Sequence, residues 1–348
     1  MSESAVRAAF AEQVGWCARL GSPFTALLCE AAGARIDRST AVGRRVLDWA
    51  GDPRPEKDNV PARLTGAFHC LVRRGAAPEL AALYPPAVLP GVEALWAAAA
   101  PLLTAHAHVF DSFLDVPPQT NEVGRSAVLM SGLLVVAERF PLPLRLFELG
   151  SSAGLNLLLD RYRYDLGGLE TGDAGSPLLL RPAWTGAAPH EAAVRIVEPR
   201  GVDLSPLDVR RDGERLLAFV WADQSERIAR LEAALAIAVA DPPLVEQGDA
   251  AAWLERVLPA APAEGAVRVV LHSVAFQYFP AETQARIAGL MARLGREASD
   301  AAPLAWLQYE HVPGNNQASL RLRCWPGGEE RQLAWAHGHG ATVEWLGD

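Results

Sequence analysis

Five small residues, Gly150-Ser151-Ser152-Ala153-Gly154, form the stretch of the sequence with the clearest potential for chemistry. They follow an apolar run over residues 144–149 that is typical of a buried parallel strand and that contains Glu148 near its end. Leucines at helical spacing come next, which predicts a helix beginning at Leu155. A strand, a turn of small residues and a helix together direct backbone N–H groups and the positive end of the helix toward a bound anion or cofactor.

This turn has three interpretations at this point. As the first turn of a nucleotide-binding sheet, it would hold a cofactor against Glu148, Gly150, Ser152 and Gly154. Read as G-x-S-x-G, it is the nucleophile elbow of a hydrolase, with Ser152 as the nucleophile. It can also be a tight turn that binds nothing. The dinucleotide fingerprint G-x-G-x-x-G does not fit, because Ser152 replaces its second glycine and Leu155 adds bulk.

Acidic residues also end two later predicted strands. Asp203 lies in the string GVDLSP, followed by Leu204, where a carboxylate can accept hydrogen bonds from the two vicinal hydroxyls of a ribose. Such an acid usually follows the glycine turn by roughly 20 residues, and we attribute the wider separation here to an insertion. Asp249, followed by Ala250, would either face an adenine amino group or cap the helix expected over residues 250–257.

Candidates for acid–base chemistry follow the next predicted strands. His272 comes after the run 267–271, and Glu310 follows the run 304–309. Either could act as a general base, with Tyr278 and His339 orienting the acceptor. Each also has a structural interpretation, such as a histidine that is hydrogen bonded inside the core. We expect no metal site.

Polar residues gather in the loop over residues 115–125, before a helix expected over residues 124–140. Gln119, Thr120, Asn121, Glu122 and Arg125 all lie near its start. Thr120 or Asn121 could cap this helix, whereas an arginine there opposes the helix dipole and needs another partner.

The surrounding elements would bring these residues to one edge of a sheet. We expect helices at about 4–20, 23–34, 40–50, 60–74 and 91–114, and therefore an all-helical domain over residues 1–118. Strands and helices alternate from residue 144, and the pair 319–324 and 332–336 forms an antiparallel hairpin. Residues 119–348 are therefore predicted to be an α/β domain with a doubly wound sheet, in which ligands bind at the carboxyl ends of the strands.

Composition narrows the choice of partners. The chain has 348 residues, of which 50% are hydrophobic, and a net charge of −9, which argues against non-specific binding to nucleic acid or to an anionic membrane surface. Its four cysteines form no C-x-x-C pair, so we expect reduced thiols and a cytoplasmic protein. The longest apolar stretches are too short to span a bilayer.

Several strings carry a resemblance to known families. Leu146–Gly154, Gly201–Pro206, Gln247–Ala250 and Val269–Pro280 resemble the successive motifs of class I S-adenosylmethionine-dependent methyltransferases. More closely, the whole chain resembles a bacterial family named domain of unknown function 2332. The strings that carry this second resemblance are QTNEVGR at 119–125, ELGSSAGLNLLLDRYRYD at 148–165, GVDLSPLDV at 201–209, WADQSERIARL at 221–231 and HGHGATVEW at 337–345.

The resemblance implies a Rossmann-like methyltransferase domain behind a helical N-terminal part, with S-adenosylmethionine as the cofactor and a small molecule as the methyl acceptor. Two departures stand out: Ser152 replaces a glycine of the usual turn, and His272-Ser273 replaces the Asn-Pro-Pro or Asp-Pro-Pro signature of enzymes that methylate amino groups. Alternatives are a non-catalytic fold that binds a nucleotide-like ligand or a protein, and a serine hydrolase. The hydrolase is weakened by the helical character of the chain upstream of Gly150.

Under the same resemblance, Arg125 and Asn121 would close the amino-acid end of the cofactor pocket. A guanidinium can bind the methionine carboxylate with two parallel hydrogen bonds. The competing interpretation is an ion pair of Arg125 with Glu122 or Glu148 that only fixes the helix.

Overall fold

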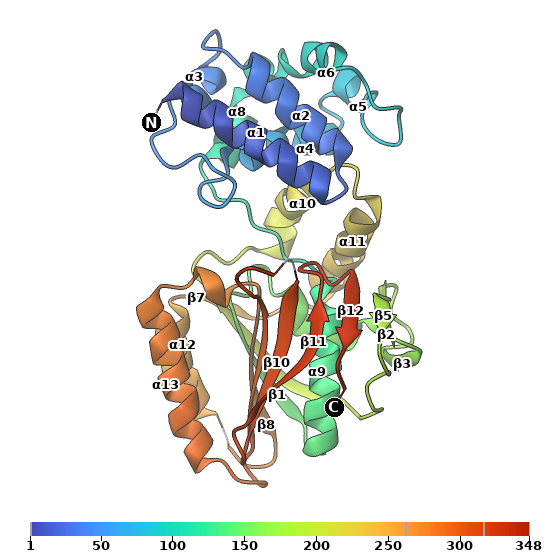
Figure 1. Ribbon diagram of the computed structural model, residues 1–348, viewed down its shortest axis with the longest axis vertical. Coiled ribbons are helices and arrows are strands. Elements are labelled where there is room, and N and C mark those ends of the chain that lie inside the picture. Colours follow the sequence, from blue (N-terminus) through green and yellow to red (C-terminus); the bar gives the residue numbers. More distant parts are fainter. Residues whose placement is uncertain (1, 262, 316, 348) are drawn as a thin grey trace. The chain divides into compact units, whose positions relative to one another are not determined.

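The computed structural model describes residues 2–261, 263–315 and 317–347. The chain divides into two compact units (Figure 1). The helical unit contains Met1–Thr120 and Asp212–Ala229, and the α/β unit contains Asn121–Arg211 and Arg230–Asp348.

In the described residues of the first unit, the regular elements are helices joined by loops and turns. They are α1 Glu3–Arg19, α2 Pro23–Arg35, α3 Ala41–Leu47, α4 Val60–Arg73, α5 Pro78–Ala81, α6 Val92–Ala99, α7 Leu102–Ala105 and α8 Ala107–Leu114, joined by most of α10 (Val209–Phe219) and the start of α11 (Ser225–Ala240). The later segment is part of the same core, because the Phe219 ring lies 5.2 Å from that of Phe113 and its edge atoms would lie 3.0 Å from a Cβ added to Gly66. Asp223 also accepts a 2.9 Å hydrogen bond from the Phe24 amide.

The expected helix over residues 91–114 is wrong in its continuity, since the structure divides it into α6, α7 and α8. Pro101 is the physical reason, because proline lacks the N–H that a helix interior requires. The expected start near Thr40 is confirmed, and its hydroxyl accepts a 2.9 Å hydrogen bond from Gly43 N.

The α/β unit is organised around a large, mostly parallel sheet with the strand order β5-β12-β11-β10-β9-β8-β1-β6-β7. Numbered along the chain, the parallel strands β7-β6-β1-β8-β9 have the order 3-2-1-4-5. The order in which strands are added to the sheet therefore reverses at β1, while all five strands point the same way. The expected hairpin is confirmed by the antiparallel pairing of β10 with β11. The strands are β1 Leu144–Leu149, β5 Ala183–Thr185, β6 Ile196–Asp203, β7 Val245–Gln247, β8 Val267–Ser273, β9 Leu304–His311, β10 Ala318–Trp325, β11 Glu330–Ala336 and β12 Thr342–Trp345.

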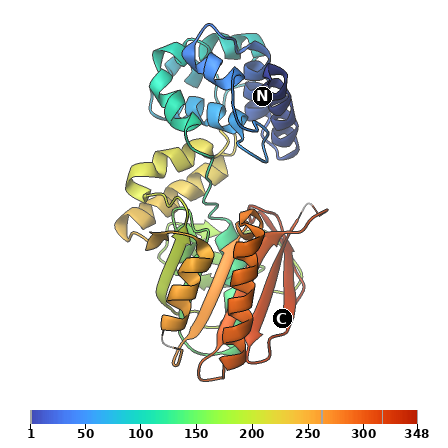
Figure 2. The ribbon, with the colours of Figure 1, turned by 90° about the vertical axis from the view of Figure 1, so that its left-hand side faces the viewer.

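Helices cover both faces of this sheet. On one face, α9 (Arg125–Arg139) packs so closely that a Cβ on Gly132 would lie 2.5 Å from Leu307. On the other, α12 (Ala250–Ala260) and α13 (Ala281–Glu297) lie side by side in Figure 2 and share a buried cluster with Phe147 and Trp306. Strands buried on both faces are apolar throughout, which is why their sequences read as continuous hydrophobic runs.

The helix expected after the glycine turn is wrong in type. Residues 155–161 form a short 3-10 helix, η1 (Leu155–Arg161), with a kink at Leu158. Residues 155–159 are buried, so the leucines serve an interior segment rather than one face of an amphipathic helix. The Tyr162 hydroxyl donates to Leu155 O at 2.7 Å and so provides a hydrogen bond for a carbonyl of the short helix.

The expected insertion between this segment and the second parallel strand forms a small separate sheet. Its strands are β2 Arg163–Leu166, β3 Leu169–Gly172 and β4 Leu179–Leu180, in the order β3-β2-β4. This sheet accounts for much of the wide separation between the glycine turn and Asp203 along the chain.

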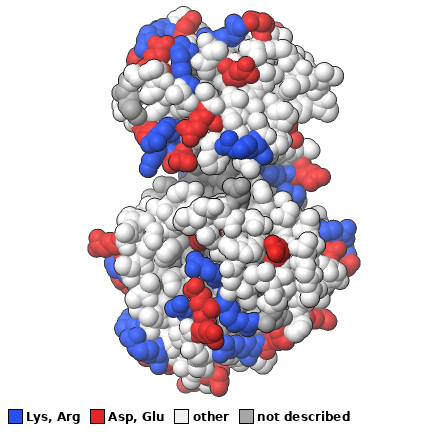
Figure 3. Space-filling view, in the orientation of Figure 1, with Lys and Arg blue, Asp and Glu red and all other residues white. Residues whose placement is uncertain are grey.

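Charged side chains of both signs are intermixed over the face shown in Figure 3. Two arginines of β10, Arg321 and Arg323, both pair with Glu330 on β11 at 3.2 and 3.4 Å. Among the described helices, none combines the length and apolar character that crossing a membrane requires.

Candidate functional site at the carboxyl edge of the sheet

Two non-glycine residues adopt left-handed backbone conformations at the ends of neighbouring strands. Ser152, after β1, has φ 54°, and Val274, after β8, has φ 50°. A β-branched residue such as Val274 pays a steric cost in this region, so the surrounding contacts must hold it there. Strain of this kind clusters at functional sites, and β1 and β8 flank the point where strand order reverses, where ligands bind in such sheets.

The backbone N–H groups of the glycine turn are largely used within the protein. A helix that would offer free N–H groups is missing after the turn, because η1 is short and kinked. The turn is therefore not built as a phosphate cradle, which needs such groups free. The N–H groups of Gly150 and Ser151 both donate to Val202 O, and that of Ser152 donates to Asp203 Oδ2. The Gly154 N–H donates to Ser151 O and the Leu155 N–H to Asn121 Oδ1, and all five distances are 2.8–3.1 Å.

Asp203 connects the ends of β6 and β1. Its Oδ2 accepts the Ser152 N–H at 2.9 Å, and its Oδ1 accepts the Ser205 N–H at 2.8 Å. The side chain is half-buried. Because a carboxylate has about four acceptor positions, these two bonds leave capacity for a ligand. The structure thus confirms Asp203 at the end of the second parallel strand and adds a direct hydrogen bond to the glycine turn.

Glu148 is enclosed beneath the turn, with only 1% of its surface exposed. Its Oε1 accepts a 3.3 Å hydrogen bond from Asn156 Nδ2, while its buried Oε2 has no hydrogen-bond partner among the described residues. Burial raises the pKa of Glu148 to about 8, although the Asn156 hydrogen bond lowers it, and the Asp203 carboxylate raises it further. Glu148 is therefore mainly protonated at neutral pH and lies next to the turn rather than in contact with solvent.

His272 and Glu310 form a buried pair across β8 and β9. His272 Nε2 accepts a 3.1 Å hydrogen bond from the Trp306 indole, which is only a donor, so the proton of the neutral ring lies on Nδ1. Nδ1 donates to Glu310 Oε1 at 2.6 Å. With no exposed surface and both nitrogens engaged, the His272 ring is placed to hold structure, not to receive a proton from a substrate.

Glu310 also fixes the loop that follows β8. The same oxygen, Oε1, accepts hydrogen bonds from the Ala275 and Phe276 amides, each at 3.1 Å, and this helps to hold Val274 in its strained conformation. Burial raises the pKa of Glu310, but its hydrogen bonds to His272 and to the two amides outweigh burial, so the pKa lies below its ordinary value. Its second oxygen, Oε2, is buried without a hydrogen-bond partner in the described part of the chain.

The remaining strand-end residues differ sharply in exposure. Asp249 caps α12 by accepting the Ala252 N–H at 2.9 Å and also accepts the Thr283 hydroxyl at 3.3 Å, while Ala250 is buried. By contrast, Leu204 is 67% exposed and Tyr278 is 72% exposed. The structure thus uses Asp249 in a cap and leaves an apolar and an aromatic side chain uncovered after β6 and β8.

Arg125 joins the start of α9 to two other segments. Its Nη1 donates to Ser273 O at 2.9 Å and its Nε to Gly338 O at 2.8 Å. The segment 337–340 packs against the same helix start, since a Cβ on Gly340 would lie 2.2 Å from Gly124 O. His339 belongs to this segment, and its ring lies 5.2 Å from that of His337.

Asn121 does not cap α9, whose N-cap is Gly124 with no side-chain hydrogen bond. It accepts the Leu155 N–H at 2.9 Å instead. Thr120 does not cap α9 either, so the capping interpretation of this loop is wrong.

Sequence reasoning missed several members of this edge. Asn156 was detectable as a single polar residue in a leucine-rich run, and it links Glu148 to Ser126, whose hydroxyl lies 2.8 Å from the Asn156 amide oxygen. Val274 and Trp306 carry no such signal, because each reads as an ordinary core residue. Within the described ranges, no group of three or more His, Cys, Asp or Glu side chains could hold a metal ion.

Comparison with known proteins identifies the family of this chain. The profile of a family described as "Uncharacterized protein conserved in bacteria (DUF2332)" matches residues 7–345. No curated protein and no solved structure shows significant similarity to the chain.

Proposed function

The chain belongs to the bacterial family DUF2332, and we propose that its α/β unit binds S-adenosylmethionine and transfers the methyl group to a small molecule. The observation that carries this proposal is Asp203. Its carboxylate lies at the end of the second parallel strand, is fixed by the turn at the end of the first, and keeps acceptor capacity. This is the position from which an acid binds the ribose hydroxyls of an adenosine-containing cofactor.

The hydrogen bonds that the turn's N–H groups make within the protein favour an adenosine-containing cofactor without phosphates. Nucleotides with a pyrophosphate or triphosphate need several free N–H groups, and here residues 150–152 already donate theirs within the protein. An adenosyl group without phosphates needs chiefly the acid and an apolar surface. The resemblance of the sequence motifs to class I methyltransferases supports S-adenosylmethionine as that cofactor.

The residues at this edge fit such a group. Ser152 Oγ is buried and has no hydrogen-bond partner among the residues described, so a polar group of a ligand would satisfy it. Leu204 offers exposed apolar surface beside Asp203, and its carbonyl accepts a 3.1 Å hydrogen bond from Gln247 Nε2 that fixes the local backbone. Arg125 and Asn121 are proposed to lie at the amino-acid end of the cofactor.

When bound, S-adenosylmethionine supplies an already activated methyl group, so the chain mainly has to position the acceptor. His272 and Glu310 contribute by fixing the loop over residues 274–279, which carries Tyr278. We therefore assign these two to positioning and propose that Tyr278 contacts the acceptor. The hydrolase alternative is disfavoured, because a serine nucleophile needs an adjacent base and Ser152 Oγ has no partner in the described structure.

Isothermal titration calorimetry with S-adenosylmethionine, S-adenosylhomocysteine, NAD⁺ and ATP tests the proposal. We expect S-adenosylhomocysteine to bind at one site. Asp203→Asn should weaken its binding by on the order of 10- to 100-fold, the effect of losing a hydrogen bond to a charged group. Asp208→Asn, which makes the same change of charge in the same loop, is the matched control and should bind like the parent.

Because Asp203 also holds the turn, a second variant separates binding from folding. Leu204→Ala removes a side chain that is mostly exposed, so its melting temperature should stay unchanged while affinity falls by about threefold to tenfold. Binding of NAD⁺ or ATP in place of S-adenosylhomocysteine, or no binding at all, would overturn the cofactor assignment. Binding without methyl transfer to any small molecule in a mass-spectrometric screen would favour the non-catalytic alternative.

A further inference from the structure

The loop over residues 274–279, which carries Tyr278, is held by hydrogen bonds from two directions. Glu310 on β9 accepts two amide N–H groups of the loop. Gln284, near the start of α13, binds the carbonyls: its Nε2 donates to Phe276 O at 3.1 Å and to Phe279 O at 2.9 Å. One side-chain amide thus joins two carbonyls that flank Tyr278 along the chain.

Ring stacking and close packing fix the same loop further. The Phe276 ring lies nearly parallel to that of His272, with centroids 4.6 Å apart. A Cβ on Gly150 would lie 2.7 Å from Ala275 Cβ, so the loop packs directly on the glycine turn. Val274, where the loop begins, keeps a strained φ of 50°. Strain of this kind costs stability and persists where a fixed geometry serves a function.

The side chain that this rigid loop presents is largely uncovered. Tyr278 is 72% exposed, while Phe276 and Phe279 lie half-buried near it with their ring centroids 5.6 Å apart. Residues 274–280 carry no charged side chain. The loop therefore presents an uncharged aromatic surface next to the glycine turn, and a flat aromatic ring packs well on such a surface.

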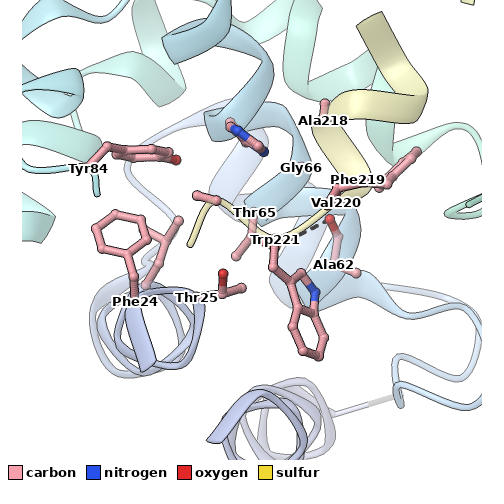
Figure 4. A pocket seen from close by; sticks show the side chains of 13 residues that line it. Phe24, Thr25, Ala62, Thr65, Gly66, Tyr84, Ala218, Phe219, Val220 and Trp221 are labelled. Atoms are coloured by element: carbon pink, nitrogen blue, oxygen red, sulfur yellow. Dashed lines mark hydrogen bonds between the residues drawn. The ribbon is translucent and has the colours of Figure 1, made fainter. Parts of the chain in front are cut away.

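The pocket of the helical unit offers no comparable surface. Helices α2 and α4, Tyr84 and residues 218–222 line it (Figure 4), and the space inside it that a water-sized molecule can reach is about 20 Å³. The Tyr84 ring packs against those of Phe24 and His69, with centroids 4.5 and 5.8 Å apart. His69 Nδ1 and the Tyr84 hydroxyl have no hydrogen-bond partner among the described residues, and this space suits ordered water.

We propose that Gln284 is a positioning residue that holds the Tyr278 ring for the methyl acceptor, and that the acceptor is an uncharged, planar aromatic compound. By joining the carbonyls on both sides of Tyr278, Gln284 fixes the direction in which this ring faces a bound compound. The assignment of that compound as an acceptor rests on the methyl transfer proposed above, whereas the positioning of Tyr278 does not.

Fluorine NMR of the full chain labelled with 3-fluorotyrosine tests the positioning role. The chain has five tyrosines, and the other four are at most 7% exposed, so the signal of Tyr278 stands apart and is assigned by its loss in Tyr278→Phe. Gln284→Met keeps the approximate size of the side chain but removes both hydrogen bonds. The Tyr278 signal should then sharpen and move toward its position in the unfolded chain, while the four buried tyrosines keep theirs.

Gln13→Met is the matched control. It makes the same change in the helical unit, where Gln13 Nε2 donates to Cys17 Sγ at 3.3 Å, and it should leave the Tyr278 signal unchanged. A Tyr278 signal that is the same in Gln284→Met as in the parent would overturn the positioning role.

Addition of indole, cyclohexanol, benzoate and tetramethylammonium to the labelled chain with S-adenosylhomocysteine tests the class of acceptor. Indole should shift the Tyr278 signal and bind at one site, and the other three should not. In Gln284→Met the affinity for indole should fall by about threefold to tenfold, because binding must then order the Tyr278 side chain.

Two results separate the parts of this inference. A response to cyclohexanol or to a charged probe that equals the response to indole, or no response to indole at millimolar concentration, would overturn the aromatic acceptor. Failure of S-adenosylhomocysteine to bind in calorimetry, together with a Tyr278 signal that still responds to Gln284→Met, would refute the methyl transfer and the acceptor but not the positioning of Tyr278.

Discussion

The buried carboxyl of Glu148 makes the stability of the folded chain fall as pH rises through neutrality. The side chain is 1% exposed, and burial raises its folded-state pKa to about 8 from an ordinary value of 4.5. Between these two pH values the folded state holds a proton that the unfolded state has released. Since the folded state then binds more protons, the free energy of unfolding decreases with pH across this window and is unaffected by Glu148 below it.

The size of the effect follows from the gap between the two pKa values. At about 1.4 kcal/mol per pH unit, Glu148 costs roughly 3 kcal/mol of stability at pH 7 and on the order of 5 kcal/mol above pH 8. Glu148→Gln keeps the shape of the side chain and an acceptor for Asn156 Nδ2 but has no proton to lose. We therefore expect the variant to match the parent near pH 5 and to be more stable by several kcal/mol at pH 8 to 9.

Urea denaturation of the parent and of Glu148→Gln, without ligand, at each pH from 5 to 9 measures this difference. The contributions of groups that do not interact with Glu148 cancel when one curve is subtracted from the other. A ¹³C titration of the Glu148 carboxyl gives the pKa directly. A difference that stays constant from pH 5 to pH 9, or a carboxyl that titrates near 4.5, would show that the argument from burial is wrong.

Three further predictions concern the same edge of the sheet. Glu310→Ala leaves the His272 Nδ1–H and two amides without their acceptor, and should lower the free energy of unfolding by about 3–5 kcal/mol in urea denaturation, whereas Glu310→Gln should lose less. Asp249→Ala removes the cap of α12 and should cost about 1 kcal/mol while leaving S-adenosylhomocysteine binding unchanged by calorimetry; weakened binding would restore a ligand role. Arg125→Lys cannot reproduce both bonds to Ser273 O and Gly338 O, so its melting temperature should fall. If the variant also loses discrimination between S-adenosylhomocysteine and adenosine, Arg125 contacts the amino-acid end of the cofactor. If its binding stays unchanged, the role of Arg125 is structural.

Local sequence signals predicted the central strands of the sheet and the positions of their carboxyl ends. The strands β1, β8 and β9 are buried on both faces, so their apolar runs mark them directly, and the polar residues that follow mark the strand ends. The glycine turn could be placed for this reason, whereas Asp203 ends β6, which is only partly buried, and was placed by the string GVDLSP. The same reasoning wrongly predicted an α-helix over residues 155–161, because leucines that are buried on all sides have the composition of a helix without its amphipathic pattern.

The hydrogen bonds of the site could not be predicted in this way. The partners His272 and Glu310 are 38 residues apart along the chain, and Arg125 reaches a carbonyl 213 residues away. Only the packing of the sheet decides that His272 is enclosed by Trp306 and Glu310 rather than open to a substrate. Likewise, nothing in the composition of residues 212–229 distinguishes them from the segments of the α/β unit on either side.

The two-segment origin of the helical unit has a consequence during protein synthesis. Ala218 and Phe219 complete a core whose other buried residues all come from the first 120, yet both are added only when residues 212–229 are made. The 109 residues from 121 to 229 take roughly 5–20 s to translate at about 5–20 residues per second. During that interval the nascent helices expose the apolar surface around Gly66 and Phe113 that Phe219 later covers, so this surface is the one that a ribosome-associated chaperone would meet first.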